Sequence, residues 1–236
     1  MIVCNDFCDT APRIDISDNV LNNNLDFDKI RKEYEENKIV IIDDILDYNV
    51  TKNLQEYMLN LNEDDFDNYY NGYFALNLPY VELTYPISLQ LQQKLKFEKY
   101  NRSWSFIYDN ISNGVHLHAD PSSTNVNIWV TPNESMVLDS NLNGLIVYPV
   151  AAPKDWTHDQ YNKNVKKSKE RCKNVNQIIS KYKFNRATIF DSMFFHESQP
   201  VRSKVGPHNK SISYNLLFGS DGDEECDSKV MLVVEK

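Results

Sequence analysis

The sequence predicts a mainly β protein with N-terminal helices, built as one domain around a jelly-roll core, the double-stranded β-helix. Three observations predict this fold class. The first hundred residues combine helical spacing with one apolar strand, the remainder contains seven or eight short β-rich segments, and Asn, Gly, Pro or Asp separates these segments. Runs of strands with turn signals between them favour a sandwich or jelly roll, with the helices packed against one sheet.

The N-terminal part is predicted to support this core. Residues 1–26 are polar and rich in Asn, so we expect an arm without a packed element. Residues 27–100 form the predicted helical and mixed support. Within this support, residues 26–38 have the spacing of a short amphipathic helix, residues 38–46 form an Ile- and Val-rich run typical of a buried strand, and residues 49–62 again have helical spacing.

Residues 101–236 are the predicted jelly-roll core. Its expected strands cover residues 103–109, 115–120, 126–132, 144–150, 186–195, 210–219 and 229–236. An insertion at about residues 152–180 is too long and too charged to be a hairpin loop. Its Lys-rich part is expected to lie in water as a helix or loop, with Cys172 as an exposed thiol.

The composition limits the classes of function. Hydrophobic residues make up 41% of the chain and the formal net charge is −9, so no general basic face is present and nucleic acid is not an expected partner. The N-terminus lacks the pattern of a signal peptide, and no apolar run reaches about 20 residues, so we expect a cytoplasmic protein without a membrane partner. The four cysteines form no C-x-x-C pair. The sequence does not predict an oligomeric state.

Two histidines and an aspartate lie within residues 116–120. Residues two positions apart share one face of a strand, so His118 and Asp120 could bind one metal ion, and His116 has the same parity. A third ligand could come from His196, at the end of a later predicted strand. Two imidazoles and one carboxylate leave coordination positions open, which is typical of non-haem Fe(II) oxygenases. The alternative interpretation is a surface His/Asp pair on an edge strand.

The ordered set of motifs resembles the 2-oxoglutarate/Fe(II)-dependent dioxygenase superfamily, in the branch of prolyl hydroxylases and phytanoyl-CoA hydroxylase-like proteins. The resemblance covers about residues 100–220 and includes a stretch at 127–148 that is similar to a W-x-TP…GGL-x-x-Y pattern of some bacterial members. It implies that His118, Asp120 and His196 are the catalytic metal ligands. It also implies Fe(II), 2-oxoglutarate and O2 as cofactors, decarboxylation of 2-oxoglutarate to succinate and CO2, and hydroxylation of an unidentified small-molecule or peptide substrate.

The same resemblance suggests residues that bind the co-substrate. The family usually places Arg, followed by a small or hydroxyl residue, on the last core strand, where the Arg pairs with the distal carboxylate of 2-oxoglutarate. Here Lys210 and Ser211 occupy that place, and Lys can neutralise a carboxylate without the bidentate fork of Arg. Arg202 is the second candidate. The resemblance also places Tyr108 near the co-substrate, and Asn127, on the strand after the metal motif, is expected to face the pocket.

Two alternatives from other classes stay open. The first is a cupin-like metal protein with a different reaction, or a zinc hydrolase, although zinc prefers closed tetrahedral sets and no H-E-x-x-H motif is present. The second is a binding jelly roll that has lost oxidation, which the Lys in place of Arg keeps possible. The resemblance, in which a single His precedes the Asp, implies that His116 is a neighbour of the metal site and not a ligand.

Overall fold

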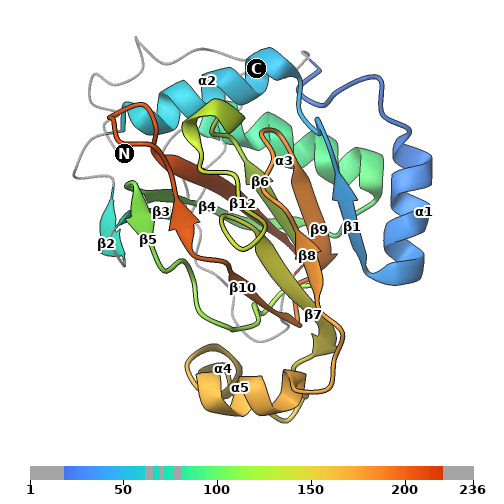
Figure 1. The fold of residues 1–236 in the computed structure, drawn as a ribbon. Helices are drawn as coiled ribbons and strands as arrows, with labels where there is room; N and C mark the ends of the chain where they lie inside the picture. Colours follow the sequence, from blue (N-terminus) through green and yellow to red (C-terminus); the bar gives the residue numbers. More distant parts are fainter. Residues whose placement is uncertain (1–18, 62–65, 70–71, 77–80, 220–236) are drawn as a thin grey trace, which may run out of the picture.

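The computed structural model describes residues 19–61, 66–69, 72–76 and 81–219, and it consists of strands with helices at the periphery (Figure 1). Its strands form a seven-stranded, a three-stranded and a two-stranded sheet, and neighbouring strands pair antiparallel throughout the described part. The prediction of a mainly β protein with helices is therefore confirmed. The predicted strand at residues 229–236 and most of the predicted arm lie outside the described residues.

The N-terminal elements are α1 (Phe27–Asn37), β1 (Ile39–Ile42), α2 (Tyr48–Leu59), β2 (Asp67–Tyr69), β3 (Gly72–Leu76) and α3 (Val81–Leu95). Asp26 and Asp47 precede α1 and α2, and their carboxylates accept hydrogen bonds from N–H groups of the first helical turn. These two helices lie where the sequence predicts helical spacing. None of the helices in the described ranges combines the length and the apolar character needed to cross a membrane.

The seven-stranded sheet has the order β1-β9-β6-β12-β4-β3-β2. Its other strands are β4 (Tyr100–Tyr108), β6 (Thr124–Trp129), β9 (Ala187–Asp191) and β12 (Ser211–Phe218). The central strand β12 pairs with β4 on one side, where Ser211 lies opposite Tyr108, and with β6 on the other, where Asn215 lies opposite Asn127. Side chains alternate between the two faces of a strand, so this register decides which residues meet on each face.

One face of this sheet packs against the helices (Figure 1). On β12 that face carries Ile212, Tyr214, Leu216 and Phe218, all of them fully buried. They join residues of α2 and α3, such as Leu54, in one apolar cluster. Full burial of an aliphatic or aromatic side chain contributes about 1.5–3 kcal/mol, so this face supplies much of the free energy of folding.

The opposite face of the large sheet is covered in part by the three-stranded sheet, whose order is β10-β7-β8 (Figure 1). Its strands are β7 (Leu145–Ala151), β8 (Ile178–Ser180) and β10 (Phe194–Ser198). Trp129 and Phe190 of the large sheet pack with Leu145 and Val147 of the small sheet in a second apolar cluster. Two antiparallel sheets packed in this way are consistent with a jelly-roll core.

Two of the predicted strands differ in the structure. Residues 115–120 form no regular strand, and His118 makes only an isolated bridge to His196. The predicted strand at 186–195 is two strands, β9 and β10, because a turn at Ser192 and Met193 moves the chain from one sheet to the other.

The insertion at residues 152–180 contains α4 (His158–Asn162), α5 (Val165–Cys172) and β8. The prediction that Cys172 is an exposed thiol is wrong. Ser168 and Cys172 lie one turn apart on the buried side of α5, and Cys172 packs in an apolar cluster with Tyr161 and Phe195. The remaining short elements are η3 (Asn133–Ser135), β5 (Ile111–Ser112) and β11 (Val201–Arg202).

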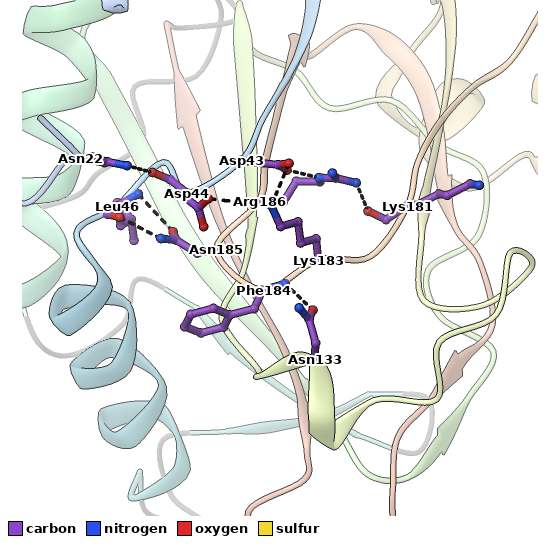
Figure 2. Close-up of polar contacts among 10 residues, drawn as sticks. All are labelled: Asn22, Asp43, Asp44, Leu46, Asn133, Lys181, Lys183, Phe184, Asn185 and Arg186. Atoms are coloured by element: carbon purple, nitrogen blue, oxygen red, sulfur yellow. Dashed lines mark hydrogen bonds and ion pairs between the residues drawn. The ribbon is translucent and has the colours of Figure 1, made fainter. Parts of the chain in front are cut away.

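A polar cluster ties the loop after β1 to the loop before β9 (Figure 2). The Asp43 carboxylate accepts hydrogen bonds from Arg186 Nε at 2.5 Å and from Lys183 Nζ at 2.9 Å. Beside it, the Asn185 side chain bonds both the N–H and the carbonyl of Leu46, at 3.1 and 2.8 Å. The hydrogen bond from Arg186 outweighs partial burial and lowers the pKa of Asp43 below its ordinary value.

Candidate metal centre

His118, Asp120 and His196 lie together on the pocket side of the large sheet, and their ligand atoms are all within 4.8 Å of one another. His118 Nε2 is 3.7 Å from Asp120 Oδ1, and His196 Nε2 is 3.4 Å from Asp120 Oδ2. Ligand atoms about 2.1 Å from a common ion and at right angles to each other lie about 3 Å apart. The three side chains therefore need only small shifts to hold one ion.

Backbone pairing brings the three residues together. The His118 N–H donates to the His196 carbonyl at 3.0 Å, and the His196 N–H donates to the His118 carbonyl at 2.8 Å. The Asp120 N–H donates to the Ser192 carbonyl at 3.0 Å. The segment that carries the H-x-D motif is thus fixed against the end of β9 and the start of β10, although it forms no regular strand.

Both imidazoles have a fixed orientation. His118 Nδ1 lies 2.7 Å from the His116 carbonyl, and His196 Nδ1 lies 2.9 Å from the Phe194 carbonyl. A carbonyl only accepts, so in each ring Nδ1 carries a proton, and Nε2 of the neutral imidazole keeps a free lone pair. The two lone pairs face the Asp120 carboxylate, which is the orientation that metal-binding histidines have when a backbone carbonyl holds the other ring nitrogen.

The charge states also fit a metal ion. Burial, together with the neighbouring His196, lowers the pKa of His118 to about 4, so its imidazole is neutral at pH 7. Burial by itself raises the pKa of Asp120, but the two imidazoles and the Arg102 guanidinium more than offset it, and the pKa falls to about 2. The site therefore presents an ionised carboxylate and at least one neutral imidazole at physiological pH, and no proton has to leave these two groups when a cation binds.

Two further side chains hold the ligands in place. Asn125, on β6, donates from Nδ2 to Asp120 Oδ2 at 3.0 Å. The Phe190 ring lies edge-on to the His196 ring, with the centroids 4.8 Å apart. Such contacts orient metal ligands and exclude water from them.

The triad lines a pocket between the two sheets. The wall from the large sheet consists of Trp104, Phe106, Tyr108, Asn125, Asn127, Phe190, Ser213 and Asn215. Val115, Leu145 and Ser198 line the opposite side. Tyr108 and Asn127 thus lie where the sequence predicts them, on the pocket face of β4 and β6.

We call one end of this pocket the deep end; it is lined by ten residues that include Tyr108, Asn127, Ser198, Ser211 and Ser213. Its polar groups are hydroxyls and amides, and no charged residue lines it within the described ranges. Asn127 Nδ2 donates to Asn215 Oδ1 at 2.6 Å. Ser211 lines the deep end, which is a buried, neutral slot.

The structure does not bring the two predicted cationic residues to this slot. Lys210 lies on the helix side of the large sheet, where its ammonium is 4.9 Å from the Tyr73 ring centroid and 3.6 Å from Asp109 Oδ1. Side chains alternate between the two faces along the chain, so Lys210 lies on the same face as Ile212. On β11, Val201 lines the deep end, whereas Arg202 Nη1 donates to the carbonyls of Ser112 and Val201. Neither Lys210 nor Arg202 is therefore positioned to bind the co-substrate at the deep end.

We call the other, more open end of the pocket the mouth; it is lined by twelve residues that include Arg102, Trp104, Phe106, His116 and Asp120. His116 Nε2 lies 3.1 Å from the Asn162 carbonyl of α4, so it is engaged away from the triad. In the described part, the group of side chains able to hold a metal contains His118, Asp120 and His196 without His116.

Sequence reasoning missed Arg102, Asn125, Ser213 and Asn215. None of them belongs to a local motif, and each reaches the pocket through its register in the large sheet. One signal was available. An Asn in the middle of a buried strand such as β12 is unusual, and the position of Asn215 could have indicated a polar pocket face.

No family model matches the sequence, and neither does any curated protein. Solved structures do match the fold. SnoK, a non-heme alpha ketoglutarate dependent carbocyclase from nogalamycin biosynthesis, superposes with a TM-score of 0.63 and 10% identity, covering 84% of this chain and 85% of that chain. A prolyl hydroxylase from Trichoplax adhaerens, in complex with a hypoxia inducible factor peptide, gives a TM-score of 0.56 and 14% identity, covering 83% and 89%.

The epimerase SnoN, in complex with Fe3+, alpha ketoglutarate and nogalamycin RO, gives a TM-score of 0.57 and 10% identity, covering 81% of this chain and 83% of that chain. At these identities the matches show the fold alone. The chain therefore has the fold of 2-oxoglutarate/Fe(II) oxygenases, and the resemblance drawn from the sequence motifs is confirmed at this level. These three proteins carry out different reactions on that fold.

Proposed function

We propose that this protein is an oxygenase that uses Fe(II), 2-oxoglutarate and O2 to hydroxylate a small-molecule or peptide substrate, with release of succinate and CO2. One observation carries the proposal. Two Nε2 lone pairs and an ionised carboxylate converge on one point at the wall of a pocket between two sheets. Two imidazoles and one carboxylate leave coordination positions open, which distinguishes such a site from a closed structural zinc site.

His118, Asp120 and His196 would hold the metal, and Fe(II) bound there would supply the redox chemistry that activates O2 and oxidises the 2-oxo acid. The protein positions and orients the metal ligands and limits the access of water to them. The carbonyls of His116 and Phe194 keep the imidazoles in the ligating tautomer. Buried walls such as Phe190 and Leu145 limit the access of water to the site.

The deep end would hold 2-oxoglutarate. Tyr108, Ser211 and Ser213 carry hydroxyls that can donate to its distal carboxylate, and Asn127 lines both the deep end and the pocket at the triad. These are neutral donors, so the carboxylate would be bound by hydrogen bonds without an ion pair. Bonds of this kind are weaker than the charge-assisted fork of an Arg, and we expect a modest affinity for 2-oxoglutarate.

The experiment that tests the proposal is turnover without the primary substrate. Purified protein is loaded with Fe(II) in the absence of O2, mixed with 2-oxoglutarate and air, and assayed for O2 consumption and succinate. We expect both signals in the native protein and neither in Asp120→Ala, whereas His116→Ala should retain them. A native protein that binds Fe(II) but forms no succinate at millimolar 2-oxoglutarate would contradict the proposal.

A second candidate is a cupin-like metal-binding jelly roll that does not use 2-oxoglutarate. The neutral deep end favours it, because a buried carboxylate without a counter-ion costs several kcal/mol unless hydrogen bonds replace its hydration. Calorimetry separates the two candidates. Binding of 2-oxoglutarate that requires the metal supports the oxygenase, and metal binding without any binding of 2-oxoglutarate supports the second candidate.

A further inference from the structure

Arg102, at the mouth, has a cationic side chain whose charge is felt by the Asp120 carboxylate but which forms no hydrogen bond or ion pair within the described ranges. It lies on β4 opposite Leu217 of β12, on the face that also carries Trp104 and Phe106. The side chain is half-buried. A guanidinium is always charged and presents five donors in a planar fork. A half-buried guanidinium without an acceptor has lost hydrogen bonds to water and has gained none from the protein. This favours a ligand as the missing partner.

The surroundings of Arg102 suit an anion with an apolar body. Phe74 and Phe106 form an aromatic wall, with their ring centroids 5.2 Å apart and their planes tilted by 44°, and Trp104 lines the same mouth. Asp120 is the one acidic residue among the described residues that line the mouth, and its carboxylate faces the two imidazoles. Once a divalent cation sits beside Asp120, the mouth carries a net positive charge.

This positive charge is local. The whole chain has a formal net charge of −9, so its surface as a whole repels anions. A cleft that carries the opposite sign with apolar walls concentrates anionic ligands at that one place. Selection of the ligand by charge is therefore a property of the mouth and not of the protein in general.

Resting on the proposed function, we propose that the mouth binds the primary substrate through a carboxylate, which Arg102 holds by paired hydrogen bonds while Trp104 and Phe106 contact the apolar body of the substrate. The substrate is thus an organic acid with an apolar or aromatic body, and Arg102 determines this specificity. A planar guanidinium fork matches the two oxygens of a carboxylate, which makes the contact directional as well as electrostatic.

The carboxylate in question belongs to the substrate and not to 2-oxoglutarate. Arg102 and Tyr108 are six residues apart on β4, which is about 20 Å at 3.3 Å per residue, so one short dicarboxylate cannot contact both ends of the pocket. The deep end is the buried slot of neutral donors, whereas at the mouth the His158 side chain is 54% exposed. A substrate that enters after the co-substrate must use the open end.

The test compares an acid with its amide as probes of the same size. The full chain is loaded with Zn(II), saturated with 2-oxoglutarate and titrated with 3-(4-fluorophenyl)propionate or with 3-(4-fluorophenyl)propionamide, and binding is followed by ¹⁹F NMR. We expect the acid to bind at least about tenfold more tightly than the amide. Arg102→Gln should reduce this ratio to within about twofold, and Arg102→Lys should retain part of it. Arg31→Gln, which removes the same charge from α1, should leave the ratio unchanged.

Three outcomes would overturn the inference. The first is equal binding of acid and amide to the native protein. The second is an acid preference that survives in Arg102→Gln, since the probe carboxylate would then be bound elsewhere. The third is a loss of 2-oxoglutarate affinity in Arg102→Gln with the probe ratio intact, which would assign Arg102 to the co-substrate. The titration needs no turnover, so failure of the oxygenase proposal would be seen separately, as an absence of succinate formation in air.

Discussion

The two faces of the seven-stranded sheet are built from alternate residues of the same strands, yet they have opposite characters. On β12, the face toward the helices carries Ile212, Tyr214 and Leu216, which are fully buried among apolar neighbours. The pocket face of the same strand carries Ser213 and Asn215, which line the cavity beside the triad. Neighbouring residues of one strand therefore serve stability and chemistry in turn. Substitutions on the helix-side face should change the free energy of unfolding, and substitutions on the pocket face should change ligand binding.

The largest expected effect comes from removing a ligand of the triad. His118→Ala should lower the affinity for Fe(II) by more than about 100-fold, because losses of 10–100-fold are typical when only a supporting contact of a ligand is removed. His116→Ala should lower it by less than about fivefold, since His116 Nε2 is engaged by the Asn162 carbonyl. Calorimetric titration of both variants without O2 measures the contrast. Equal losses in the two variants would show that the triad does not define the metal site.

The helix-side face should determine stability. Leu216→Ala removes a fully buried side chain and should lower the free energy of unfolding by about 3 kcal/mol. The matched change on the pocket face, Ser213→Ala, should lower it by less than about 1 kcal/mol and should weaken binding of 2-oxoglutarate instead. Urea denaturation, together with co-substrate titration of the folded variants, checks both halves. If Ser213→Ala costs as much stability as Leu216→Ala, the two faces are not separable.

A cation placed on the pocket face should strengthen co-substrate binding. Ser211→Arg puts a guanidinium at the neutral deep end and should lower the Kd for 2-oxoglutarate about tenfold through a charge-assisted fork. Lys210→Arg, one residue away, should change that Kd by less than about twofold because the side chain lies on the helix side. Pyruvate, which lacks the distal carboxylate, serves as the control ligand in both titrations. Tighter binding of 2-oxoglutarate in Lys210→Arg would contradict the assigned faces.

The alternation of side chains between the two faces of a strand also marks the limit of prediction from the sequence. The motif of His118, Asp120 and His196 has a fixed order and types of residue that suit a metal, so the sequence was sufficient to select the triad that the structure brings together. The expectation for Lys210 rests on its place before the last strand and takes no account of which face of the strand its side chain occupies. The apolar alternation that begins at Ile212 already places position 210 on the helix side, and this signal could have been used.

Other features depend on pairings that no local pattern encodes. Arg102 reaches the mouth because β4 pairs with β12, which lies more than one hundred residues later in the chain. The segment before Asp120 has the composition of a strand but forms only an isolated bridge to His196, and a turn at Ser192 and Met193 splits the strand predicted at 186–195. Register and turns of this kind are set by tertiary packing and not by propensity.

The smallest expected effect lies at the rim of the sheet, on neither face, in the cluster of Asp43, Lys183 and Arg186 (Figure 2). Arg186→Gln should lower the free energy of unfolding by less than about 1 kcal/mol at pH 7, since the Asp43 side chain is 41% exposed. The Arg186 hydrogen bond holds the pKa of Asp43 below 3.8. The stabilisation is therefore present above that value and is lost as the pH falls through the folded pKa. Urea denaturation at pH 7 and at pH 2 should show that the difference in the free energy of unfolding between native and variant protein is smaller at the lower pH. Metal affinity at pH 7 should be unchanged. An equal loss of unfolding free energy at both pH values would mean that packing of the Arg186 side chain, and not its charge, stabilises the rim.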